Sequence, residues 1–169
     1  MKLVLFAHRT VGFECVKYLH ENSIDQLVVI SNDDTGEDTS FKSVKKLVID
    51  KHISFIQTRS INDNVLFEKL KFFNANASFS CYFPMIIPKK ILSLFKNGSL
   101  NLHGALLPEY MGTFSGAWSL LNDEKKSGST LHYMNEKVDT GDIVDRIEVL
   151  INKNDTALSL YNKISLKSI

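Results

Sequence analysis

Two polar side chains share one short apolar run near the middle of the chain. Asn101 and His103 are separated by one residue in the stretch SLNLH, and a turn at Leu107-Pro108 follows. If the stretch is a β-strand, side chains two residues apart point to the same side. Burying either group without a partner costs roughly 1–3 kcal/mol, so the amide and the imidazole must find partners or do chemistry. An imidazole in such a place can move protons near neutral pH, although a single buried histidine can also be purely structural.

A carboxylate that can complete this pair lies downstream. In the stretch HYMNEKVDTGDIV, Asp139 follows a polar turn and precedes Thr140-Gly141. A carboxylate on a glycine-containing loop can orient an imidazole and favour its charged form, or it can serve its own turn through a side-chain hydrogen bond. Three other carboxylates compete for the same role, and spacing alone does not exclude them: Glu136, Asp142 and Asp145.

A second group of candidate residues follows the first apolar run. Residues 3–7, LVLFA, have the length of a buried strand and lead into His8, Arg9 and Thr10. Open α/β sheets bind ligands at the carboxyl ends of their strands, so these three residues are ligand-binding candidates, and a solvated turn is the alternative. The turn holds one glycine, Gly12, where a dinucleotide fingerprint needs three, which argues against a nicotinamide cofactor.

The elements that position these residues alternate between strands and helices. We expect strands over residues 3–7, 26–31, 53–58, 77–83 and 99–103, and helices over about 10–21, 41–51 and 63–73, with a short helix led by Pro88. After Pro108 we expect a helix over 113–121, antiparallel strands over 128–134 and 142–151, and a helix from Asp155; residues 31–40 are a loop. The pattern predicts an α/β fold: a Rossmann-like, mostly parallel sheet with helices on both faces and a short antiparallel C-terminal extension.

Composition predicts one ordinary globular domain over residues 1–169. Hydrophobic residues are 44% and charged residues 23% of the chain, and the formal net charge of +1 gives no general electrostatic footprint for nucleic acid or an anionic membrane. Two cysteines, Cys15 and Cys81, are too few for a disulfide framework or a metal cluster, and we expect both to be reduced and buried. No apolar run reaches the length of a membrane span or a signal-peptide core, so a cytoplasmic protein is expected.

Three segments taken together resemble the 10-formyltetrahydrofolate-dependent formyltransferases. The family pattern of Asn-x-His, Leu-Leu-Pro and a later Asp-x-Gly loop is matched by NLHGALLPEYMG, GAWSLLN and SGSTLHYMNEKVDTGDIV. With MKLVLFAHRTVG, SNDDTGE and FSCYFPMIIP added, the chain is most similar to the branch that acts on UDP-4-amino-4-deoxy-L-arabinose and related nucleotide sugars. The resemblance covers nearly the whole chain and places Asn101, His103 and Asp139 in the catalytic positions.

The resemblance implies transfer of a formyl group from N10-formyltetrahydrofolate, as co-substrate, to the amine of a sugar linked to dTDP or UDP. Its setting would be synthesis of lipopolysaccharide, O-antigen or another surface polysaccharide, with no metal, no nucleic acid and no membrane as partner; a homodimer is also expected. The resemblance assigns folate contacts to Phe83, Met85, Ile86, Asn135, Val138 and Asp139.

Acceptor contacts are expected where two loops leave the carboxyl ends of strands. By that geometry they fall on His8, Arg9, Thr10, Tyr110 and Phe114. Arg9 can pair with a diphosphate through its planar guanidinium, and Thr10 can cap the helix that follows. Core packing is the alternative for the apolar and aromatic candidates Met85, Ile86, Tyr110 and Phe114. Core support is also the expectation for Trp118 and His132, which match family motif positions.

Two departures from the family favour a nucleotide-sugar acceptor. The stretch AHRTVG lacks the glycine-rich phosphate turn of purine-pathway formyltransferases, and the chain does not continue into the C-terminal domain of a methionyl-tRNA enzyme. By the same resemblance, the chain ends at Ile169 before the catalytic domain is complete. Two alternatives stay open. The chain could be the catalytic domain of a methionyl-tRNA formyltransferase, or a truncated remnant that binds folate or nucleotide sugar without turnover.

Overall fold

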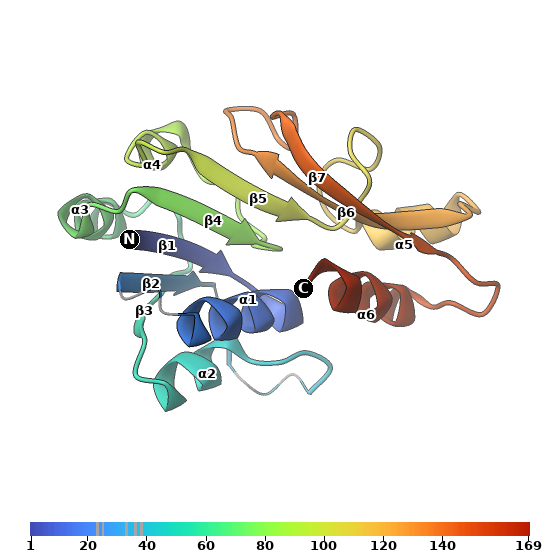
Figure 1. Cartoon of the computed structure of the whole chain (residues 1–169), viewed down its shortest axis with the longest axis horizontal. Coiled ribbons are helices and arrows are strands. Elements are labelled where there is room, and N and C mark those ends of the chain that lie inside the picture. Colours follow the sequence, from blue (N-terminus) through green and yellow to red (C-terminus); the bar gives the residue numbers. More distant parts are fainter. Residues whose placement is uncertain (23, 25, 33, 36, 38) are drawn as a thin grey trace. The chain divides into compact units, whose positions relative to one another are not determined.

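The computed structural model describes residues 1–22, 24, 26–32, 34, 35, 37 and 39–169, and Figure 1 shows its helices and strands. The strands are β1 (Lys2–Ala7), β2 (Gln26–Ser31), β3 (Ser54–Gln57), β4 (Ala77–Cys81), β5 (Ser99–His103), β6 (Lys126–Tyr133) and β7 (Ile143–Leu150). The helices are α1 (Arg9–Glu21), α2 (Val44–Asp50), α3 (Asn64–Phe73), α4 (Lys89–Leu92), α5 (Ser115–Leu121) and α6 (Ala157–Ser168). The strand order is β3-β2-β1-β4-β5-β6-β7.

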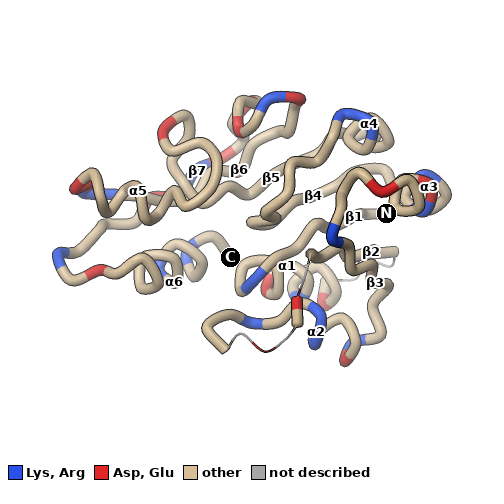
Figure 2. Tube along the Cα trace, turned by 180° about the vertical axis from the view of Figure 1, so that it is seen from behind, with Lys and Arg blue, Asp and Glu red and all other residues tan. Residues whose placement is uncertain are grey.

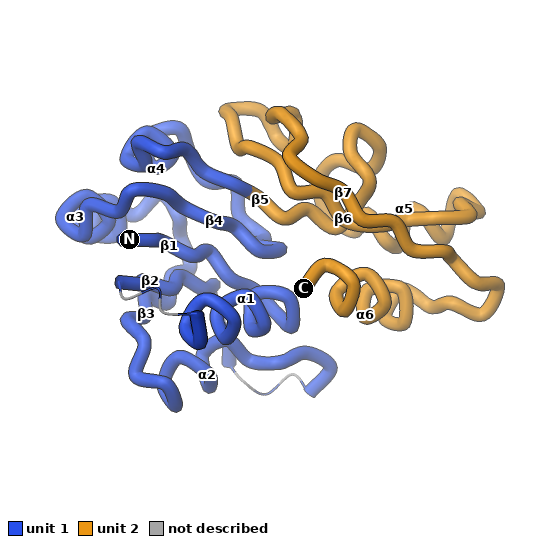
Figure 3. The backbone as a smooth tube through the Cα atoms, viewed as in Figure 1, with its two compact units in different colours: residues 1–100 blue, residues 101–169 orange. Residues whose placement is uncertain are grey.

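The chain forms two compact units, residues 1–100 and 101–169, which Figure 3 shows in different colours. The unit boundary falls inside β5, after Leu100. Parallel pairing holds among β1, β2, β3 and β4, and antiparallel pairing joins β6 to β7. The predicted α/β class, mostly parallel with an antiparallel C-terminal part, is confirmed.

In the first unit, β1 is the buried centre of the parallel strands. Residues 4–7 have no exposed surface, because β2 and β4 flank the strand and α1 packs against it. The helix begins close to the strand that it follows: a Cβ atom on Gly12 would lie 2.8 Å from the carbonyl carbon of Ala7. The segment His8–Thr10, where β1 ends and α1 begins, is therefore held by buried structure on its N-terminal side.

Local hydrogen bonds set the helix and strand ends that the sequence pattern placed only approximately. The side chain of Asp63 caps α3 by accepting from the Val65 N–H. The Ser43 side chain caps α2, so this helix begins at Val44, later than predicted. Strand β4 ends at Cys81, earlier than predicted, because Tyr82 adopts a φ of 54° that no extended strand allows.

The second unit is a β-hairpin with two helices packed on it. The hairpin strands β6 and β7 pair antiparallel, and a β-bulge between Leu131 and His132 shifts the register near the loop end. Helix α6 contributes Leu160 and Ile164 to a buried cluster with Val149 of β7. This cluster fixes the far end of the hairpin, so the loop between β6 and β7 extends from a well-packed base.

The structure bears on what the sequence predicts about membrane spans, cysteines, charged residues and the loop over residues 31–40. None of the helices in the described part of the chain combines the length and the apolar character that crossing a membrane requires. Both cysteines are free; Cys81 is buried, whereas Cys15 is half-buried. Figure 2 shows basic and acidic residues interspersed along both units. Residues 33, 36 and 38 of the predicted loop lie outside the described residues, and the described residues from 32 to 40 contain no helix or strand.

Candidate active site

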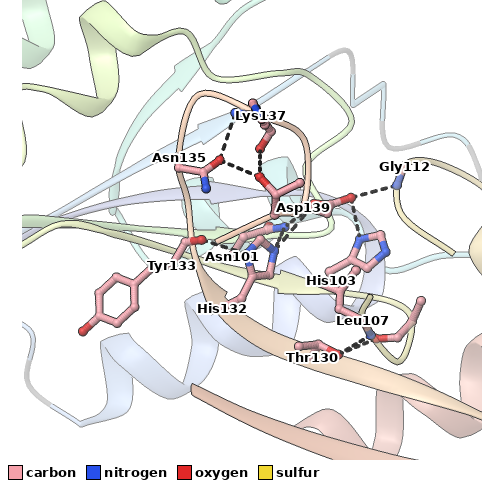
Figure 4. A network of polar contacts seen from close by, with 12 residues as sticks. Asn101, His103, Leu107, Gly112, Thr130, His132, Tyr133, Asn135, Lys137 and Asp139 are labelled. Atoms are coloured by element: carbon pink, nitrogen blue, oxygen red, sulfur yellow. Dashed lines mark hydrogen bonds and ion pairs between the residues drawn. The ribbon is translucent and has the colours of Figure 1, made fainter. Parts of the chain in front are cut away.

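Asn101 and His103 lie on the same side of β5, as their spacing predicts, and both face the side chain of Asp139 (Figure 4). The Asn101 Nδ2 atom is 3.5 Å from Asp139 Oδ1. The His103 Nδ1 atom is 3.4 Å from Asp139 Oδ2, and the imidazole is almost fully buried. The structure thus brings together the three side chains that the sequence singled out as a catalytic set. All three belong to the second unit.

The carboxylate paired with His103 is that of Asp139, which resolves a choice that spacing left open. Asp139 Oδ2 also accepts a hydrogen bond of 2.8 Å from the Gly112 backbone N–H. Of the competing carboxylates, Asp145 accepts instead from the backbone N–H of its neighbour Arg146. One carboxylate therefore joins β5 to the loop that follows it.

The Asp139 carboxyl group is held in its ionised form. Burial alone would raise its pKa, but the neighbouring His132 side chain, the charge on His103 and the Gly112 N–H together outweigh burial and hold the pKa below its usual value. A carboxylate ionised at neutral pH can orient an imidazole and stabilise a positive charge on it.

Both ring nitrogens of His103 face acceptors. Nδ1 faces the Asp139 carboxylate, and Nε2 lies 3.0 Å from the backbone oxygen of Tyr110. A carbonyl oxygen can only accept, so Nε2 carries a hydrogen in this arrangement. The turn that presents this carbonyl has Tyr110 and Gly112 at positive φ, 55° and 87°. The Tyr110 hydroxyl donates to Glu124 at 2.7 Å, which ties the turn to the segment that follows α5.

The loop that carries Asp139 is closed by a tight backbone contact. The Tyr133 N–H donates to the Asp142 carbonyl at 2.9 Å, which ends the hairpin at the loop. A Cβ atom on Gly141 would lie 1.7 Å from the Tyr133 oxygen, so only glycine fits there. The Asp-x-Gly pattern thus has a local physical reason: the glycine allows the closure that places the aspartate.

Hydrogen bonds inside the loop hold its shape. The Asn135 Oδ1 atom accepts from the Lys137 N–H at 2.9 Å and from the Thr140 hydroxyl at 3.0 Å. Asp139 itself has a φ of 52°, an unfavourable conformation for a residue with a Cβ atom. The loop therefore holds its carboxylate in an orientation that the isolated backbone would not favour.

His132 is part of this polar cluster, although sequence reasoning assigned it only to core support. It is 1% exposed, so the expected burial is correct. Its Nε2 atom lies 3.1 Å from Asn101 Nδ2 and 3.6 Å from Asp139 Oδ1. The signal that could have found it is the alternation of Thr130 and His132 on one side of β6, the same two-residue spacing as in β5. Trp118, in contrast, is 54% exposed, so its predicted role in core support is wrong.

The predicted folate residues fall on both units. In the second unit, Asn135 shapes the loop and Val138, next to Asp139 in the chain, is 45% exposed. In the first unit, the Phe83 ring packs on Phe6, with ring centroids 5.4 Å apart. Two further candidates, Met85 and Ile86, are half-buried and 70% exposed respectively. Core packing is thus excluded for Ile86.

The predicted acceptor residues of the first unit lie where β1 ends and α1 begins: His8 is the N-cap residue, and Arg9 and Thr10 are the first two residues of the helix. The pKa of His8 is lowered to about 4, chiefly by burial and also by the charge of Arg9, so its imidazole is neutral at neutral pH. The Arg9 guanidinium lies over the Phe41 ring, 4.3 Å from its centroid. Thr10 does not cap α1, because His8 occupies the N-cap position; the Thr10 hydroxyl oxygen instead accepts from the Lys42 N–H at 3.3 Å.

The acceptor candidates of the second unit differ in exposure. Phe114 occupies the N-cap position of α5 with a φ of 61° and is 79% exposed, so core packing is excluded for it. The Tyr110 ring is fixed through its hydroxyl by Glu124 and by Asn122, whose amide donates at 3.1 Å. Within the described part of the chain, no set of three His, Cys, Asp or Glu side chains has an arrangement that could hold a metal ion.

Comparison with known proteins gives consistent matches over nearly the whole chain. The family model described as formyl transferase matches residues 1–168. The bifunctional polymyxin resistance protein ArnA of Wigglesworthia glossinidia brevipalpis is 35% identical over 171 aligned residues, which cover 100% of this chain and 26% of ArnA. The chain therefore spans about a quarter of the length of this relative.

Two solved structures are similar at 30% identity or more. WlaRD, a sugar 3N-formyltransferase crystallised in the presence of dTDP and 5-N-formyl-THF, is 30% identical with a TM-score of 0.80; the match covers 99% of this chain and 58% of WlaRD. An N-formyltransferase from Helicobacter canadensis in complex with folinic acid and dTDP-3-aminofucose is 32% identical with a TM-score of 0.81; that match covers 98% of this chain and 59% of the other.

Proposed function

Since this chain belongs to the formyl transferase family, we propose that it transfers a formyl group from N10-formyltetrahydrofolate to the amine of a nucleotide-linked amino sugar. The observation that carries the proposal is the cluster of Asn101, His103 and Asp139, whose residue types suit acyl transfer to an amine. The similar structures obtained with a folate and with dTDP or a dTDP-linked amino sugar support the two substrate classes. The proposed setting is synthesis of lipopolysaccharide, O-antigen or another surface polysaccharide, as expected from the sequence.

The reaction needs an oxyanion donor and a proton carrier. The sugar amine attacks the formyl carbon, the carbonyl oxygen becomes negatively charged, and the bond from carbon to the folate N10 then breaks. The Asn101 amide N–H donates to the oxyanion, the largest stabilisation that such a site offers. The proton lost by the amine ends on N10, so a group that takes up and releases a proton near neutral pH completes the reaction.

His103 is proposed as the proton carrier, with Asp139 as its partner. The carboxylate 3.4 Å from Nδ1 orients the ring and stabilises a positive charge on it, so that Nε2, which holds a hydrogen toward the Tyr110 carbonyl, can release a proton to N10 and take up the proton lost by the amine. Because the pKa of Asp139 is held below its usual value, the carboxylate stays ionised over the working pH range. Neither a metal ion nor a covalent intermediate is part of this mechanism.

The binding residues remain predictions. Folate is proposed to contact Phe83, Met85, Ile86, Asn135, Val138 and Asp139, and the acceptor to contact His8, Arg9, Thr10, Tyr110 and Phe114. Exposure of Ile86, Val138 and Phe114 agrees with ligand contact, because large apolar side chains gain from being covered. A cytoplasmic location and a homodimer are likewise proposed, as expected from the sequence.

The direct test is release of tetrahydrofolate by the purified chain. N10-formyltetrahydrofolate would be supplied with dTDP-3-aminofucose, dTDP-linked 4-amino sugars, UDP-4-amino-4-deoxy-L-arabinose and, separately, methionyl-tRNA. Turnover with an amino sugar is the expected result. Turnover with methionyl-tRNA alone would establish the alternative enzyme, and folate binding without any turnover would indicate a binding remnant.

A variant of Arg9 tests the acceptor assignment by itself. We expect Arg9→Ala to weaken nucleotide-sugar binding and leave folate binding intact, because a guanidinium pairs with a diphosphate through a planar fork of donors. Lys17→Ala, an exposed cation on the same helix, is the matched control and should change neither affinity. An equal loss of both affinities in Arg9→Ala, or no loss, would remove Arg9 from the acceptor site.

A further inference from the structure

The buried His132 links the Asn101 side chain to the backbone of its own strand. Its Nδ1 atom is 2.8 Å from the Tyr133 carbonyl oxygen, and its Nε2 atom is 3.1 Å from Asn101 Nδ2 (Figure 4). Both distances fall within the range of good hydrogen bonds. The β-bulge just before His132 sets the local register from which the ring reaches Asn101.

These two contacts define the protonation pattern of the ring. A carbonyl oxygen can only accept, so Nδ1 carries the hydrogen. An amide NH₂ group can only donate, so Nε2 has a free lone pair and accepts. His132 is therefore the neutral tautomer with its hydrogen on Nδ1.

The contact with Asp139 disfavours the flipped orientation of the Asn101 amide. With oxygen and nitrogen exchanged, the amide oxygen would lie 3.5 Å from Asp139 Oδ1, which is also an acceptor. It would also face His132 Nε2, and a hydrogen there would require either a charged ring or loss of the bond to Tyr133. Neutral His132 thus accepts one N–H of the amide and fixes which end of it faces Asp139.

We infer that His132 is a positioning residue for formyl transfer, which holds the Asn101 amide with its N–H groups toward the reacting formyl oxygen. The inference rests on the proposed role of Asn101 as oxyanion donor. One N–H is used by His132; the second has only a 3.5 Å contact with Asp139 Oδ1, too long for a strong bond, and is left for the substrate oxygen. If the Asn101 amide were flipped, its carbonyl oxygen would face the developing negative charge and oppose the reaction.

Two substitutions separate this role from simple core support. His132→Gln can place its amide oxygen near the position of Nε2 and keep the acceptor for Asn101. His132→Asn can keep a donor near Nδ1 for the Tyr133 carbonyl but offers nothing at the position of Nε2. The assay is folate release with dTDP-3-aminofucose, or with whichever amino sugar of the panel gives turnover. We expect kcat to fall about 10- to 100-fold in His132→Asn, somewhat less than on full loss of an oxyanion donor. In His132→Gln, kcat should stay within about threefold of the wild-type value. KM for the folate should stay unchanged in both, because the lost interaction acts in the transition state.

A double substitution shows whether His132 acts through Asn101. The variant Asn101→Ala/His132→Asn should turn over no more slowly than Asn101→Ala, because an acceptor for the amide has no effect once the amide is gone. Losses that multiply, or equal losses in His132→Gln and His132→Asn, would overturn the inference. Near-normal turnover in Asn101→Ala would instead overturn the site assignment in the proposed function.

The tautomer can be measured without any variant. In the ¹⁵N-labelled wild-type chain, long-range ¹H–¹⁵N correlation should show His132 with a protonated Nδ1 and an unprotonated Nε2 at neutral pH. This readout stands even if a substitution at a buried position prevents folding or if the chain shows no turnover. A hydrogen on Nε2 would overturn the inference.

Discussion

Replacing Gly141 by alanine tests how the loop between β6 and β7 delivers Asp139. The new Cβ atom would lie 1.7 Å from the Tyr133 oxygen and 2.7 Å from the Tyr133 carbonyl carbon. Since real Cβ atoms essentially never approach heavy atoms closer than 3.0 Å, the two backbones must separate by at least about 1.3 Å. The atoms that must move belong to backbone, so no side-chain rotation can relieve the contact.

This movement acts on the catalytic carboxylate. Asp139 lies two residues from Gly141, and its contacts with Gly112 and His103, at 2.8 and 3.4 Å, leave no room for a shift of this size. A misplacement of about 1 Å costs about 10²-fold in rate, so kcat should fall by that factor. Overpacking should also lower the free energy of unfolding by about 1–3 kcal/mol.

The assay is folate release with a responsive amino sugar, together with thermal denaturation and two control variants. Gly128→Ala places a Cβ atom 1.9 Å from the Ile147 oxygen inside the hairpin, so it should lose stability similarly but keep kcat within a few-fold once folded. Gly116→Ala in α5 meets only the Leu160 side chain at 3.9 Å, so it should keep both properties. Wild-type kcat in Gly141→Ala would refute the argument that this glycine places Asp139.

Three further predictions concern single side chains. His103→Ala and Asp139→Ala should each lower kcat far more than thermal stability, and Asn101→Ala should lower it roughly 10²–10³-fold; near-normal rates in all three would place the active site elsewhere. The pKa of His8 is lowered from 6.5 to about 4 in the folded chain. Its titration therefore does not affect the free energy of unfolding above pH 6.5, and it lowers that free energy as the pH falls toward 4, because the unfolded chain takes up the proton first. Urea unfolding across that range should show a slope of up to about 1.4 kcal/mol per pH unit from this residue, absent in His8→Gln; identical slopes would contradict the assignment. Thr130→Val should lower the free energy of unfolding by about 2–4 kcal/mol, because the buried hydroxyl serves two backbone groups at 2.7 and 3.0 Å; Thr130→Ser should restore most of the loss, and chemical denaturation of the pair checks it.

The sequence by itself determined the order of the elements and the first half of the site. Strands 26–31 and 99–103 have the predicted ends, because continuous apolar runs bounded by polar residues have few other ways to be buried. The two-residue period of a strand also determined that Asn101 and His103 face the same side. These are local properties, set by residues within a few positions of one another.

Only the tertiary structure decided which groups meet that pair. The contact of Asp139 with His103 depends on the pairing register of β6 and β7, the bulge before His132 and the close approach at Gly141. Each of these moves an atom by an ångström or more, and hydrogen bonds tolerate only a few tenths. Four carboxylates were therefore candidates from the sequence to pair with His103, and in the folded chain Asp139 is the one paired with it.

The same reason explains the residues that sequence reasoning misplaced. Exposure of Trp118 depends on how α5 lies on the hairpin, and the N-cap position of α1 falls on His8 rather than on Thr10 because of the backbone after β1. His132 was recognisable from its sequence as a buried side chain. Its hydrogen bond to Asn101 joins residues 31 positions apart, and only the paired strands bring those two groups within 3.1 Å.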